Sequence, residues 1–159
     1  MSGLFKVPIF GATMTTGVQY DIWGITNHAT RPTILKGMKL FQVSEFGDAQ
    51  EEIIALQLAT GHGTIGSGGA VGAITPINTD RGGSAAGFTA RGMDTTKATG
   101  GTKVAVDPIE WNIRAGSDII LPEEWQIIIP AAVLWTIEML TNPAGTKTIY
   151  GSLLVQEIG

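Results

Sequence analysis

The sequence predicts an all-β protein, a sandwich or a barrel of short strands. Apolar and polar residues alternate with a period of two along several segments, as in strands that pack one face against a core. Clusters of turn-forming residues separate these segments at the short intervals typical of all-β domains. The stretch 60–101 differs, because it holds twelve of the chain's 22 glycines and few large side chains. With 159 residues, the chain is predicted to form a single β-sandwich domain over 1–159.

Two strands are expected in the N-terminal part. The first spans 18–25, where apolar and polar residues alternate and β-forming types dominate. Arg31-Pro32 marks a turn, and the second strand follows at 34–43. Gly37 lies inside this second strand and predicts a bulge or a corner there.

The segment 48–59 fits two structures. Asp48 as N-cap and Glu51 three residues later match the start of a capped helix. Within 53–59, however, large apolar residues alternate with Ala and Gln, as in a strand. The β character of the rest of the chain favours the strand.

A second series of strands is expected in the C-terminal part. They span 110–114, 119–121, 125–129, 133–140 and 148–158. Asp107-Pro108 and Asn142-Pro143 are interpreted as turn initiators. The most apolar window, 125–140, is interrupted by polar residues and a proline and is too short to span a bilayer, so we interpret it as two strands.

We predict that 60–101 is an extended arm between the two strand-rich halves, running along the sandwich surface or onto a neighbouring molecule. It has too few large side chains to bury much apolar area alone, and loops of this length inside compact domains are usually functional or disordered. The predicted subunit or capsid contacts are the apolar anchors and two arginines of this arm. They are Ile74, Ile77, Arg81, Phe88, Arg91 and Met93. The arginines flank Phe88 and are expected to pair with carboxylates of a partner.

The amino-acid composition argues against several classes of function. Charged residues make up only 15% of the chain, against about 25% in typical soluble proteins, and 43% of residues are hydrophobic. A surface poor in charge favours a homo-oligomer. The net charge is −4 and the basic residues are scattered singly, which argues against nucleic-acid binding. The absence of cysteine excludes disulfides, thiolate metal sites and cysteine nucleophiles, and we expect no secretory signal and no membrane segment.

The sequence contains no convincing pattern for catalytic or cofactor-binding chemistry. Residues 61–66 match G-x-G-x-x-G, but the glycines that follow cannot open the helix that a dinucleotide site needs. His28 and His62 lie far apart, and we interpret them as a turn residue and a solvated loop residue, not as ligands of a cupin-type metal site. General acid–base catalysis needs two carboxylates that face each other across a substrate. The side chains of Glu51-Glu52 would point to opposite faces of a strand, and Glu123-Glu124 indicates a polar turn, so neither doublet forms such a pair. We therefore predict no catalytic residue, no metal and no cofactor.

The four tryptophans allow two interpretations. Trp23 and Trp111 lie in alternating strand patterns, while Trp125 and Trp135 are placed symmetrically about Pro130, as facing positions of a hairpin would be. Tryptophans spread over four strands are typical of core and interface anchors. Two of them exposed and coplanar in a groove would instead form a platform for stacking sugars.

Several runs in the glycine-rich segment carry a resemblance to a known family. They are 68–80, 84–91 and 95–101, and the runs 121–125 and 150–157 extend the likeness to the end of the chain. In composition and order, the chain over about 18–159 resembles the small capsid decoration (cement) proteins of tailed bacteriophages. The resemblance implies a jelly-roll-like β-sandwich that binds the major capsid protein on the capsid surface of the virion, commonly as a trimer, after synthesis in the host cytoplasm. It carries over no functional residues.

The leading hypothesis is a structural protein without catalysis that binds the outside of a capsid shell and stabilises it. The alternative is a phage tail or spike module that recognises a surface glycan or a protein receptor. A metal-dependent enzyme on a jelly-roll fold ranks third.

Overall fold

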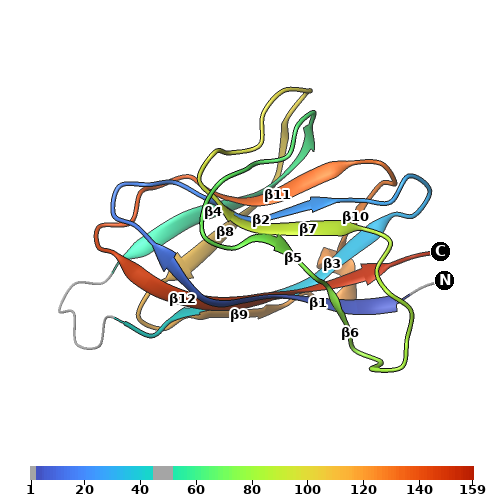
Figure 1. Ribbon diagram of the computed structural model, residues 1–159, viewed down its shortest axis with the longest axis horizontal. Coiled ribbons are helices and arrows are strands. Elements are labelled where there is room, and N and C mark those ends of the chain that lie inside the picture. Colours follow the sequence, from blue (N-terminus) through green and yellow to red (C-terminus); the bar gives the residue numbers. More distant parts are fainter. Residues whose placement is uncertain (1–2, 45–51) are drawn as a thin grey trace.

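Two antiparallel sheets packed face to face make up the computed structural model, which describes residues 3–44 and 52–159 (Figure 1). Sheet A contains β1 (Gly3–Met14), β3 (Thr33–Gln42), β6 (Ile77–Asn78), β9 (Ser117–Ile120), β10 (Ile127–Ile129) and β12 (Lys147–Glu157). Sheet B contains β2 (Asp21–Thr26), β4 (Ile53–His62), β5 (Gly72–Ile74), β7 (Thr89–Asp94), β8 (Val104–Asn112) and β11 (Leu134–Met139). A 3-10 turn, η1 (Glu123–Trp125), separates β9 from β10. No helix in the described part of the chain is long and apolar enough to cross a membrane.

The pairing of the strands is that of a jelly roll. β1 pairs with β12, β2 with β11, β3 with β9 and β10, and β4 with β8, so early strands pair with late ones in reverse order. A two-stranded ribbon rolled onto itself gives this arrangement, with its layers forming the two sheets. Sheet A runs β10-β3-β12-β1-β6 and sheet B runs β5-β7-β2-β11-β4-β8. The predicted all-β sandwich is confirmed.

Most expected strands are present. The strand alternative for 53–59 is confirmed as β4, whereas Asp48 and Glu51 lie outside the described residues. The bulge expected at Gly37 is also present, because Lys36 has no partner where β3 pairs with β12.

Outside the glycine-rich segment, β1 is the strand that the sequence pattern does not predict. β1 buries Phe5, Val7 and Ile9, then shifts register before burying Ala12 and Met14. The bulge between Ile9 and Ala12 breaks the alternation, which hides the period of two from a sequence pattern.

Two turn predictions are wrong. Asp107-Pro108 lies inside β8, which among the described strands pairs with β4 alone and is therefore an edge strand where a proline is tolerated. Trp125 and Trp135 do not face each other in a hairpin, because the chain crosses at Pro130 from β10 in sheet A to β11 in sheet B.

The core lies between the sheets and contains three of the four tryptophans. Trp23, Trp111 and Trp135 are fully buried. Two of them satisfy their indole N–H groups inside the core, where Trp23 donates to the carbonyl of Val7 and Trp135 to the side-chain oxygen of Asn27, each at 3.1 Å. This agrees with the prediction of core anchors.

The glycine-rich segment 60–101 is woven into the edge of the sandwich rather than lying wholly outside it. It completes β4, adds β6 beside β1, and adds β7 beside β2 and β5 beside β7 (Figure 1). Small residues permit this close passage: a Cβ added at Gly92 would lie 2.7 Å from Cδ1 of Ile74. Phe88 packs edge-on against Phe5 with ring centroids 5.5 Å apart.

Candidate interaction surface

The histidines do not form a metal site. Among the described residues no group of three or more His, Asp or Glu side chains gathers so that it could hold a metal ion. His28 is a turn residue as predicted, with Nδ1 3.1 Å from the Thr30 hydroxyl. The prediction of a solvated His62 is wrong, because this residue is the buried end of β4 and lies 3.2 Å from the Thr136 hydroxyl.

Sheet B carries a row of polar side chains on its outer face, three of them buried carboxylates. The register places Asp94, Asp21, Glu138 and Gln57 side by side on β7, β2, β11 and β4. A bulge in β2 leaves Ile22 without a partner and so turns Asp21 toward the same face as Glu138. The sequence pattern missed this row, because the acidic residues are far apart along the chain.

Cations and a backbone amide neutralise the row. Lys97 lies 3.1 Å from Glu138, which also contacts Lys103 and Gln57. Arg91 binds both carboxylate oxygens of Asp94 at 2.9–3.2 Å. The backbone N–H of Ala98 donates to Asp21 at 2.6 Å. These contacts fasten the segment 95–103 onto sheet B, which is a structural use of the charges.

Burial shifts the pKa values of several side chains in and beside this row. It raises the pKa of the Asp21 carboxyl to about 6, opposed by the Ala98 N–H and by Lys97. Burial by itself also raises the pKa of Glu138, but hydrogen bonds from Lys103, Gln57 and Lys97 outweigh it and hold that pKa below its ordinary value. Burial lowers the pKa of His62.

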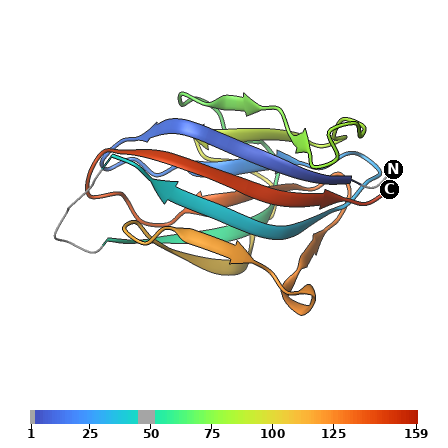
Figure 2. The same ribbon diagram turned by 90° about the horizontal axis from the view of Figure 1, so that it is seen from below.

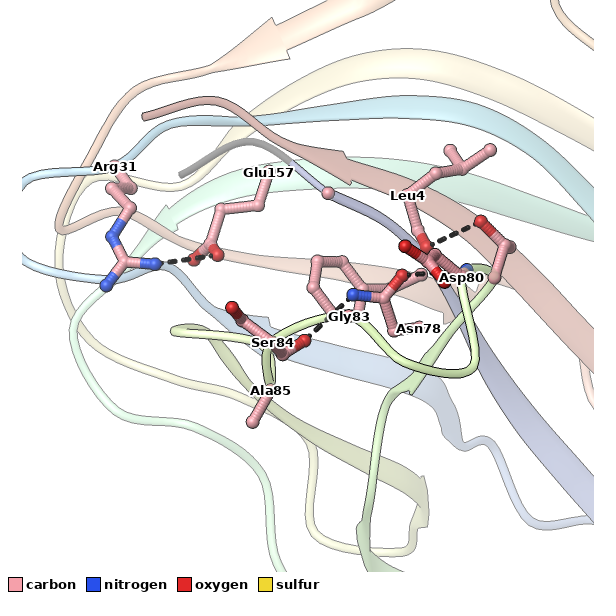
Figure 3. Close-up of a pocket in the computed structure, with 11 residues that line it drawn as sticks. Leu4, Arg31, Asn78, Asp80, Gly83, Ser84, Ala85 and Glu157 are labelled. Atoms are coloured by element: carbon pink, nitrogen blue, oxygen red, sulfur yellow. Dashed lines mark hydrogen bonds and ion pairs between the residues drawn. The ribbon is translucent and has the colours of Figure 1, made fainter.

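A cavity of about 370 Å³ lies where the chain ends meet the loop 78–87 (Figure 3). Arg31 and Glu157 point toward each other there and form an ion pair of 2.9 Å. The backbone N–H of Gly87 also donates to Glu157, at 3.1 Å, and the Thr79 hydroxyl donates to the carbonyl of Leu4, at 3.0 Å. The polar groups of this cavity thus tie the loop to β1 and β12.

The six predicted contact residues divide into two groups. Phe88 and Met93 are buried in the core of their own chain, and Arg91 binds Asp94 of its own chain. Ile77 and Arg81 are exposed and Ile74 is half-buried, all three at the edge formed by β5 and β6. Contact with another molecule stays a prediction, and the observed exposure favours it for the second group.

The outer face of sheet A gathers apolar side chains from five strands in two adjacent rows. In one row, Ile128 pairs with Ile34, Ile34 pairs with Gln156, and Gln156 pairs with Leu4. In the neighbouring row, Ile120 and Leu154 pair with Gly37 from its two sides. We call the five apolar residues Leu4, Ile34, Ile120, Ile128 and Leu154 the outer patch. Ile120 is 78% exposed and Ile128 is 63% exposed, and Leu4, Ile120 and Leu154 line a shallow groove of about 390 Å³. Figure 2 shows this face toward the viewer. Exposed apolar side chains gathered on one face mark an interaction site.

Only one tryptophan is available for contacts outside the chain. Trp125 is 68% exposed, whereas the other three are buried. All four lie in the described residues, so a platform of two exposed tryptophans is not formed.

Comparison with known proteins gives distant similarities only. No protein-family model and no curated protein matches the chain. A chain of the T13 IBDV viral particle aligns with 98% of this chain at 13% identity and a TM-score of 0.30, and this chain spans about a third (31%) of its length. VP17, a capsid protein of bacteriophage P23-77, aligns over 100% of this chain and 98% of its own at 10% identity and a TM-score of 0.20. Similarities this low carry no argument about function.

Proposed function

We propose that this chain is a structural protein of a phage virion that binds the outer surface of the capsid shell and stabilises it. The outer patch is the observation that carries the proposal, because it gathers five apolar side chains on the outer face of a paired sheet. The resemblance of 68–80, 84–91, 95–101, 121–125 and 150–157 to capsid decoration proteins supplies the expected partner, the major capsid protein.

The sheet suits such a role because it holds the patch in place before binding. β12 pairs along its length with both β1 and β3, so the patch residues lose little backbone freedom on contact. Burying one exposed isoleucine completely is worth about 1.5–3 kcal/mol. A protein that binds the intact shell but not the opened shell stabilises the intact shell by mass action. Many bound copies of this chain would therefore raise the temperature at which the shell opens.

Two substitutions in the outer patch test the proposal. We expect an Ile120→Glu/Ile128→Glu double variant to fold but to lose binding, by at least tenfold, to shells assembled from the major capsid protein of the same genome. Co-sedimentation with the shells measures it. Ile53→Glu is the matched control, because Ile53 is also an exposed strand isoleucine but belongs to sheet B. Equal binding of the double variant and the wild type would refute the proposal.

We further propose that the chain acts as a homo-oligomer, a trimer that matches the three-fold positions of a capsid. The low proportion of charged residues and the exposed apolar side chains support this. Light scattering of the free protein measures its oligomeric state.

The exposed Trp125 is the observation that favours the alternative, a tail or spike module. A single indole can stack on one sugar ring. Glycan binding that Trp125→Ala abolishes, together with no binding to capsid shells, would favour that alternative.

A further inference from the structure

Trp125 stands on a turn that is held rigidly at one edge of sheet A. The turn 121–126 joins β9 to β10, and both strands pair with β3. The backbone N–H of Leu121 donates to the carbonyl of Lys36 at 2.8 Å, and the Lys36 ammonium donates to the Gln126 side chain at 2.6 Å. Figure 2 shows the turn, in orange, projecting from this edge. A large apolar side chain that is fixed in solvent is typical of an interface anchor.

A groove that fits such an anchor lies at the opposite edge of the same sheet. It has a volume of about 460 Å³ and lies between β1 and the strands β5 and β6. Its apolar lining includes Phe10, Val71, Ile74 and Ile77, and no charged side chain of the described residues lines it. Phe10 is 75% exposed and Ile77 is 45% exposed, so the groove is open to a partner.

The start of the turn and one end of the groove lie at the same level along the strands. The groove extends from there beside β1 as far as Thr13. Ile120, the last residue of β9, pairs with Gly37, which pairs with Leu154. Leu154 pairs with Lys6, and Lys6 pairs with Ile77 at the end of the groove. One row across sheet A therefore connects the start of the turn to the groove at the far edge.

The two edges carry opposite charges. Glu123 and Glu124 are exposed beside Trp125, while Lys6 and Arg81 are exposed beside Ile77. Within residues 3–44 and 52–159, none of these four side chains forms an ion pair. Asp80, next to Arg81, accepts a hydrogen bond from the backbone N–H of Gly82 at 3.2 Å. Opposite charges on two complementary surfaces favour one orientation of contact.

We infer that the Trp125 turn of one copy inserts into the groove between β1 and β5 of a second copy, with Glu123 and Glu124 facing Lys6 and Arg81. This inference rests on the proposal that the chain forms an oligomer. The contact is head-to-tail, because it joins different surfaces of two identical chains. A head-to-tail contact builds a ring when its rotation closes. A trimer is a ring of this kind.

Two complementary variants test the contact. Trp125→Ala removes the anchor and keeps the groove, while Ala73→Glu blocks the groove at an exposed position and keeps the anchor. We expect each variant alone to be monomeric and their mixture to form a heterodimer, because the mixture retains one intact junction. Light scattering of the full chains gives the masses, and circular dichroism verifies folding. Ala29→Glu, in the exposed turn between β2 and β3, is the control and should assemble like the wild type.

A charge exchange tests the orientation independently. We expect Glu123→Lys/Glu124→Lys and Lys6→Glu/Arg81→Glu each to weaken association at least tenfold, and the variant that combines all four changes to restore it. A monomeric wild type, a Trp125→Ala variant that assembles normally, or a mixture that stays monomeric would overturn the inference. If monomers still bind capsid shells through the outer patch, the proposed function stands and only the head-to-tail contact fails.

Discussion

Asp21 is buried beside a second carboxylate, Asp94, on the neighbouring strand. One of its oxygens accepts the Ala98 N–H, and the other has no partner among the described residues. Burial raises its pKa from 3.8 to about 6, so the folded protein holds this proton more tightly than the unfolded chain does. The stability from protonated Asp21 is therefore fully present below about pH 4 and is lost as the pH rises through about 6.

We expect Asp21→Asn to remove this dependence. The variant should exceed the wild type in free energy of unfolding at neutral pH, by up to about 3 kcal/mol, the equivalent of the pKa difference. The gap should narrow as the pH falls from about 6 to about 4. Urea unfolding across this range measures it, with Asp118→Asn at an exposed position as the control. A variant that is less stable than the wild type at neutral pH would contradict the prediction.

Among the elements, the segment 95–103 depends on charge more than on apolar packing. Glu138 on β11 is its main attachment, through Lys97 and Lys103. Lys97 also donates to the carbonyl of Met139 at 2.7 Å. Because hydrogen bonds hold the pKa of Glu138 below 4.5, this attachment is complete above that pH and is lost as the pH falls through the lowered value.

Glu138→Gln keeps the size of this side chain and removes its charge. We expect the amide hydrogen of Ala98 to exchange at least tenfold faster in the variant, because the segment opens more often. Hydrogen exchange followed by mass spectrometry measures it. Glu110→Gln, on the exposed side of β8 in the same sheet, is the control. Unchanged exchange at Ala98 would show that other contacts hold the segment.

At the scale of the whole molecule, the glycine-rich excursion closes one long edge of the sandwich. β6 extends sheet A, β7 and β5 extend sheet B, and Phe88 joins the core between them. An arm that only reached a neighbour would leave β2 as an edge strand. Here β7 covers that edge through five paired positions from Asp21 to Thr26.

Deletion of 82–100 should therefore destroy the fold and not merely assembly. We expect loss of the cooperative thermal transition, because β7 and the core residues Phe88 and Met93 are removed. The fluorescence of the buried tryptophans reports it. Gly82→Ser/Ala85→Ser, at two exposed positions of the loop before β7, is the control and should leave the transition in place. A sharp thermal unfolding transition in the deletion variant would contradict this prediction and show that the segment is an appended arm.

Local pattern was sufficient for most strands and for the fold class. The strands at 53–59 and 148–158 could be predicted because alternation of burial is a property of adjacent residues. Absence of cysteine likewise excluded whole classes of chemistry from the sequence alone. Bulges could not be predicted from the local pattern. One bulge interrupts the alternation in β1, so this strand was not predicted, and another turns Asp21 to an unexpected face of the sheet.

Pairing partners required the tertiary structure. Nothing near His62 or Asp21 in the sequence indicates burial, which comes from Thr136, Glu138 and Ala98 far along the chain. The outer patch and the two complementary edges likewise arise only when distant strands align in register. Register between distant strands depends on contacts over the whole core and on how loops close, so it is a property of the assembled sheets and not of any local pattern.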